Sequence, residues 1–87
     1  MANIRINSVA MIDGKVTANR TLDKSQNPPR LIVEGALQTK EYIEEIFRIE
    51  TARFTLEDVE VFHESFGTED DEIVYAFTAG NLIVAED

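Results

Sequence analysis

His63 is the only histidine of this 87-residue chain, and Glu60 and Glu64 lie close to it in sequence. An imidazole beside carboxylates can act as a general base or bind a metal ion. A lone histidine among carboxylates on a strand is more often a partly exposed side chain with neither role. No serine lies in a nucleophile motif, and the chain has no cysteine. We therefore predict no catalytic residue and no enzymatic activity.

Four consecutive acids, residues 69–72, offer the oxygen ligands that Ca²⁺ and Mg²⁺ prefer. They lack the alternate spacing and the glycine of an EF-hand loop. Consecutive side chains on an extended chain also point in different directions. We predict a solvated charged turn and no metal site. The four glycines form no phosphate-binding motif, so we expect no nucleotide cofactor, and no cofactor of any other kind.

Charge is distributed very unevenly along the chain. Residues 1–53 hold all eight basic residues and seven acids, whereas residues 54–87 hold ten acids and no base, which together give the net charge of −9. A negative field repels nucleic-acid phosphates and anionic membranes and attracts basic partners. Direct nucleic-acid binding is therefore disfavoured, although acidity also serves solubility alone.

Two phenylalanines lie among these acids. Phe62 and Phe66 flank His63 and Glu64, and either side chain would serve the core or, if exposed, form an apolar anchor surrounded by carboxylates. Such anchors are typical of protein–protein interfaces. The predicted partner-binding residues are Glu57, Asp58, Glu60, Phe62, Glu64, Phe66, Glu69, Asp70, Asp71 and Glu72.

The length indicates one domain spanning residues 1–87, with a single small core. The first eight residues contain no apolar signal segment, and no apolar run is long enough to cross a membrane. The lack of cysteine is consistent with a reducing compartment. We expect a cytoplasmic protein, or one associated with a virion.

The first half of the chain reads as strands. Asp13-Gly14 lies between β-rich segments and predicts a hairpin with strands near 3–12 and 15–22, with a bulge or bend near Asn7 and Ser8. Residues 23–29 end in Pro28-Pro29 and predict a loop, followed by a third strand over 30–37.

The segment 40–50 carries apolar residues at helical spacing after Thr39, a suitable N-cap, and predicts a helix, with a strand as the alternative. Residues 54–64 predict a strand with a bulge at Glu57-Asp58, although a helix capped by Thr55 also fits. A turn over 65–71 precedes a strand from residue 72. Gly80-Asn81 either turns the chain into a last strand or lies at a bulge within one strand over 72–85.

The predicted order is β-β-β-α-β-β-β. It indicates an α+β fold, in which one helix packs on a small, mostly antiparallel sheet or a partly open barrel of about five or six strands.

LIVEGALQTKEY at 31–42, INSVAMIDGKVT at 6–17 and FTLEDVEVF at 54–62 resemble strands of bacterial single-stranded-DNA-binding proteins of the OB-fold class. The resemblance covers about a third of the chain and implies a barrel in which Tyr42 lies in a strand. The chain departs from that class in lacking tryptophan and in having no base after Arg53. Such proteins need a basic groove with stacking aromatic side chains.

These patterns favour a non-enzymatic acidic module that binds a basic protein surface. It could be an inhibitor from a phage or mobile element that occludes a nucleic-acid-binding surface of its partner, in the manner of a DNA mimic. The first alternative is a self-assembling structural subunit of the phage tail or capsid type, which pairs with copies of itself through edge strands. The second alternative is an OB-like single-strand binder that uses Arg20, Lys24, Arg30 and Lys40.

Overall fold

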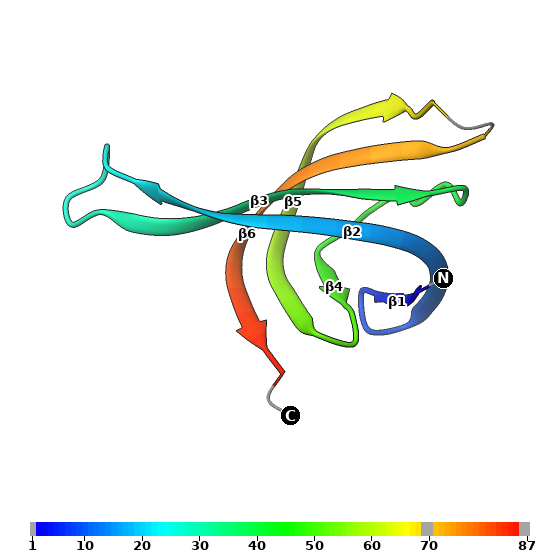
Figure 1. Ribbon diagram of the computed structural model, residues 1–87, viewed down its shortest axis with the longest axis horizontal. Helices are drawn as coiled ribbons and strands as arrows, with labels where there is room; N and C mark the ends of the chain where they lie inside the picture. The colour runs from blue at the N-terminus through cyan, green and yellow to red at the C-terminus, as the bar shows by residue number, and fades with distance from the viewer. Residues whose placement is uncertain (1, 69–70, 86–87) are drawn as a thin grey trace.

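A computed structural model describes residues 2–68 and 71–85 (Figure 1). It contains six strands, all paired antiparallel, in a closed barrel of order β1-β2-β3-β6-β5-β4. The strands are β1 (Ala2–Ile6), β2 (Ala10–Asp23), β3 (Arg30–Thr39), β4 (Arg48–Glu50), β5 (Phe54–Phe66) and β6 (Ile73–Val84). The described residues contain no helix, so the predicted α+β fold is wrong and the fold is all-β.

The barrel consists of two three-stranded meanders, β1-β2-β3 and β4-β5-β6. The meanders join along β3–β6 and along the short β1–β4 contact, where Ile6 faces Ile49. Alternate apolar side chains point inward and bury a core around Ile4, Leu37 and Phe77. Closing the sheet leaves no interior face exposed, so such a short chain can bury a core without a helix.

The first turn lies at Asn7-Ser8 and not at Asp13-Gly14, so the predicted hairpin is wrong. Asn7 and Ser8 have φ of 54° and 65°, and the Val9 N–H donates to the Ile6 carbonyl at 3.1 Å, as in a type I′ turn. Gly14 lies inside β2, where it pairs with β1 and β3. A Cβ on Gly14 would lie 2.6 Å from the Gln38 carbonyl oxygen, so glycine is needed there for close packing.

The helix predicted over 40–50 is also wrong. Residues 40–47 have no regular structure and cross from β3 to β4, which are not neighbours in the barrel. The apolar residues of this segment do not form one buried stripe. Ile46 is buried and Ile43 is partly buried, while Tyr42 is 71% exposed. Tyr42 lies in neither a helix nor a strand, contrary to both expectations. We call residues 40–47 the crossover.

The strand predicted over 54–64 is confirmed as β5, and the helical alternative is wrong. The phase slip at Asp58 is also present, because Leu56 and Val59 both point into the core and Asp58 has φ of 54°. The register of β5 against β6 does not change there, however, and shifts between Val61 and His63. β6 continues through residues 80 and 81, so the chain does not turn there, and the alternative of one long strand is confirmed. The bulge predicted at Gly80 is wrong, because the register against β5 does not change there.

One hairpin extends beyond the barrel (Figure 1). β1 pairs with β2 only as far as Gly14, and β6 pairs with β3 only from Val33 onward. The segment 20–32, which we call the tip, therefore has no strand partner except within its own hairpin.

Candidate functional site

A hollow of about 590 Å³ lies between the crossover and β5, and we call it the acidic groove. It is lined by residues 44–47 of the crossover and residues 59–64 of β5. Ile46 and Val59 are buried and Val61 is half-buried, so these three side chains form an apolar lining. The two walls flank the β4–β5 hairpin, in which Arg48 pairs with Glu57, and this hairpin brings them together.

Two exposed phenylalanines line this groove. Phe47 is 50% exposed and Phe62 is 65% exposed. Phe62 lies at the register shift of β5, where it has no cross-strand partner on β6. Val59 and Val61 point toward the core, so strand alternation places the Phe62 ring on the outer face. Water contact with two large apolar rings costs free energy that a partner could recover by covering them.

Four glutamates surround these rings: Glu44, Glu45, Glu60 and Glu64, all of them exposed. No lysine or arginine lines the groove, and His63 is its one nitrogenous side chain that can ionise. The groove thus combines an apolar lining with a negative rim, an arrangement suited to a partner that offers both apolar and basic groups.

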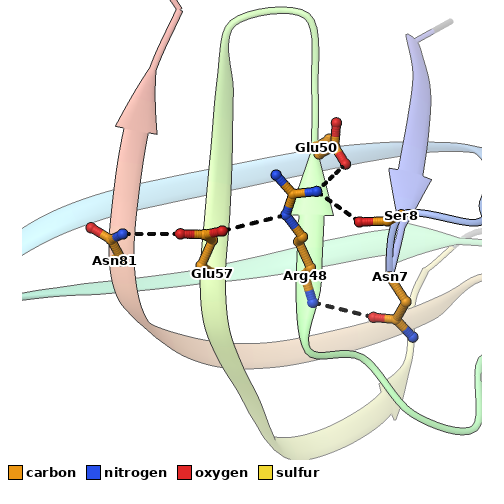
Figure 2. Close-up of polar contacts among 6 residues, drawn as sticks. All are labelled: Asn7, Ser8, Arg48, Glu50, Glu57 and Asn81. Atoms are coloured by element: carbon orange, nitrogen blue, oxygen red, sulfur yellow. Dashed lines mark hydrogen bonds and ion pairs between the residues drawn. The ribbon is translucent and has the colours of Figure 1, made fainter.

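Asn7 fixes the crossover wall from the β1–β2 turn, and Figure 2 shows its contact with the backbone of Arg48 at the end of that wall. Its side-chain amide donates to the Glu45 carbonyl at 2.7 Å, and its side-chain oxygen accepts from the backbone N–H of Phe47 at 2.8 Å and of Arg48 at 3.2 Å. Further along the wall, the Val59 N–H donates to the Phe47 carbonyl at 3.0 Å. These bonds set the spacing between the two walls of the groove.

Arg48 follows the crossover and holds β4 in a polar network (Figure 2). Its Nη1 donates to Ser8 Oγ and to Glu50 Oε1, both at 2.7 Å. Its buried Nε lies 3.6 Å from Glu57 Oε2, which is an ion pair but too long for a hydrogen bond. Glu57 also accepts from the Asn81 amide at 3.1 Å. The charge of Arg48 is therefore matched within its own network.

Tyr75 supports the crossover from inside the barrel. Its side chain is only 1% exposed, and its hydroxyl accepts from the Ile43 N–H at 2.8 Å and donates to the Glu41 carbonyl at 3.4 Å. Burial raises the pKa of the Tyr75 phenol, while the bond from Ile43 acts in the opposite direction. The hydroxyl of the neutral phenol thus provides hydrogen-bond partners for backbone groups of the crossover. In a helix these groups would have bonded to other backbone groups of the same helix.

The structure brings together three of the predicted partner-binding residues, Glu60, Phe62 and Glu64. Glu57 belongs to the Arg48 network and Asp58 to the strained bend of β5. Phe66 is 87% exposed at the end of β5, outside the lining of the groove. Asp71 lies in a turn with φ of 60°, and Glu72 lines a different hollow. Glu69 and Asp70 lie outside the described residues.

Sequence reasoning missed the opposite wall: Glu44, Glu45 and Phe47. The helix predicted over 40–50 places Phe47 on its apolar stripe and gives the two glutamates no role in a binding site. A glutamate two residues before the phenylalanine was a signal, because Glu45 precedes Phe47 as Glu60 precedes Phe62. The helix predicted over 40–50 left no place for the β4–β5 hairpin that brings the two segments together.

A second hollow, of about 770 Å³, lies between the start of β1, the middle of β2, the end of β3 and the β4–β5 turn. Its charged residues are balanced in number: the bases are Lys15, Lys40 and Arg53, and the acids are Asp13, Glu41 and Glu72. The bases predicted for single-strand binding are divided, since Arg20, Lys24 and Arg30 lie on the tip and Lys40 follows the opposite end of β3. This hollow therefore has no net charge that would select a basic or an acidic partner.

Within residues 2–68 and 71–85, no three potential metal ligands of the histidine, cysteine, aspartate or glutamate type lie close enough to hold an ion. In the same part of the chain, no helix has the length and apolar character to cross a membrane. Comparison of the chain with models of protein families, with curated proteins and with solved structures finds no match.

Proposed function

We propose that the protein is a non-enzymatic binding module that takes up a basic protein surface in the acidic groove. The observation that carries this proposal is the combination of two exposed phenylalanines and four glutamates, without a lysine or arginine, around one hollow. Aromatic side chains are enriched among the residues that dominate binding energy. Carboxylates around them discriminate in favour of basic partners.

The mechanism is occlusion. A partner's lysines and arginines are attracted by the field of the acidic half, and its apolar atoms then cover Phe47 and Phe62. A surface that is basic because it handles nucleic acid fits this description, so the module would compete with nucleic acid for that surface. An inhibitor from a phage or mobile element would have this mode of action. We propose that the protein is such an inhibitor, located in the cytoplasm or carried with a virion.

The test measures binding of a fluorescent arginine-rich peptide by anisotropy, with variants in matched pairs. Glu60→Gln with Glu64→Gln removes charge from the groove, while Glu57→Gln removes one charge from the same strand outside it. Phe62→Ala truncates a groove phenylalanine, while Phe66→Ala truncates an exposed one outside it. We expect each groove variant to raise Kd about tenfold or more, as hot-spot truncation does.

The two control variants should bind the peptide like the parent protein, and affinity should fall as salt rises. Equal losses in Glu57→Gln and in the groove variants would show that binding follows overall charge and not this groove. Affinity that does not change with salt would contradict the electrostatic part of the proposal.

A further inference from the structure

The inference concerns the tip, residues 20–32, which has an uncovered apolar face. Leu22 on β2 faces Leu31 on β3, and they are 48% and 63% exposed. By strand alternation both leucines lie on the same face as Val33, which is buried in the core. The tip therefore continues the inward face of the barrel beyond the point where other strands cover it.

The tip is also the most basic part of the chain. It carries Arg20, Lys24 and Arg30 against a single acid, Asp23. Asp23 accepts hydrogen bonds from the backbone and hydroxyl of Ser25, which hold the pKa of its carboxyl below the usual value. Among the residues that the structure describes, none of the three tip bases is in an ion pair, since the ion pairs found there all belong to Arg48.

We infer that the tip of one molecule docks in the acidic groove of a second copy of this chain. The tip offers three bases beside two exposed leucines, and the groove offers four glutamates beside two exposed phenylalanines. Both the charges and the apolar surfaces are therefore complementary. This inference rests on the proposed function, because it names a partner for the same groove.

A molecule cannot satisfy its own groove in this way. The tip projects from one end of β3, whereas the crossover begins at the other end of that strand (Figure 1). The hairpin ladder between them pairs continuously from Gly14–Thr39 to Asp23–Arg30, which keeps the two ends apart. Since tip and groove are different surfaces, the contact is heterologous, and repeating it produces a closed ring or an open filament.

The contact is made by side chains and not by strand addition. β5 pairs with β4 through residues 55–57, and the Val59 N–H bonds to Phe47, so in the described part of the chain β5 has an unpaired edge only after Val59. The register shift at Phe62 distorts this edge, and such shifts discourage another strand from pairing. The groove beside this edge remains accessible to the side chains of the tip.

The experiment measures mass in solution by light scattering on a sizing column, over protein concentration and salt. Arg20→Glu with Arg30→Glu reverses the tip, and the fourfold change of Glu44, Glu45, Glu60 and Glu64 to arginine reverses the groove. Each reversed protein alone should stay monomeric, because its tip and groove then carry charges of the same sign. An equimolar mixture should assemble again, because the reversed tip fits the reversed groove and the two unchanged surfaces fit each other.

Three further variants separate packing from charge and from folding. Leu22→Ser with Leu31→Ser should raise the concentration for half-assembly about tenfold or more, whereas Val9→Ser, at an exposed position on the β1–β2 turn, should not change it. A chain with Asn-Gly in place of residues 21–32 should keep the circular dichroism of the barrel and be monomeric. Assembly by this shortened chain would overturn the inference.

The arginine-rich peptide distinguishes failure of this inference from failure of the proposed function. The tip-reversed protein should bind the peptide at least as well as the parent, because its groove is intact. A parent that stays monomeric at all concentrations but binds the peptide would overturn the inference and leave the proposed function standing. A mixture that assembles from reversed proteins, when the parent does not bind the peptide, would support the inference and count against a foreign basic partner.

Discussion

At the residue scale, Tyr75 shows how one buried hydroxyl sustains an irregular segment. Its ring belongs to the core, while its oxygen bonds to backbone groups of Ile43 and Glu41 in the crossover. A crossover without regular structure has no internal partners for its backbone, so each buried group must find one elsewhere. The groove wall therefore depends on a residue that does not line the groove.

Replacing Tyr75 with phenylalanine should lower the free energy of unfolding by about 1–3 kcal/mol at neutral pH, because the Ile43 N–H loses its partner. The pH dependence should differ as well. The folded pKa of Tyr75 is raised above 10.0, so its contribution to stability is complete below pH 10.0 and is lost as pH rises through the folded pKa. Urea unfolding of both proteins, from neutral pH to above pH 10.0, measures this difference. Equal slopes in the two proteins would contradict the assignment.

At the element scale, the crossover is held against the β1–β2 turn by Asn7. This residue supplies the positive φ that the type I′ turn requires and three side-chain hydrogen bonds across 38 to 41 positions of sequence. Asparagine tolerates the left-handed region better than most residues. One side chain thus determines both where the chain turns and where the crossover lies.

Asn7→Ala should destabilise the protein by about 2–4 kcal/mol, because it loses these bonds and strains the turn. Asn7→Gly removes the same bonds but adopts positive φ freely, so its stability should lie between those of Asn7→Ala and the parent. Thermal and urea unfolding followed by circular dichroism measures the order. If Asn7→Gly is as stable as the parent, the side-chain hydrogen bonds of Asn7 contribute nothing to stability. If Asn7→Gly is no more stable than Asn7→Ala, alanine causes no strain in the turn.

At the scale of the whole molecule, the net charge of −9 acts on folding and on binding in opposite directions. Like charges in the compact state repel one another, and the ion pairs formed by described residues involve a single base, Arg48. The same charge attracts a basic partner from a distance. Salt weakens both effects.

Added sodium chloride should therefore raise the Tm while it weakens binding to the arginine-rich peptide. A gain of about 1 kcal/mol corresponds to a rise in Tm of roughly 4–8 °C for a domain of this size. The variant with Glu60→Gln and Glu64→Gln should show a smaller rise, because less repulsion remains to be screened. A Tm that falls with salt would mean that the Arg48 network contributes more to stability than the repulsion costs.

Part of the fold was predictable because it follows from local pattern. The strands β3 and β5 and the phase slip at Asp58 were identified from alternation of apolar residues, which nearby residues determine. Half of the groove was predictable for the same reason, since Glu60, Phe62 and Glu64 lie within one strand. The asymmetry of charge is a property of composition alone.

The remaining features depended on closure of the barrel. Asn7-Ser8 and Asp13-Gly14 are both acceptable turns locally, but β1 must end early enough for Ile6 to reach Ile49. The segment 40–50 has helical spacing, yet Tyr75 and Asn7 supply distant hydrogen-bond partners that replace those of a helix. The sequence by itself determined strand content, charge and the acidic wall of β5. Only the tertiary structure decided the first turn and the path of the crossover, because local preferences of about 1 kcal/mol yield to core burial and long-range hydrogen bonds.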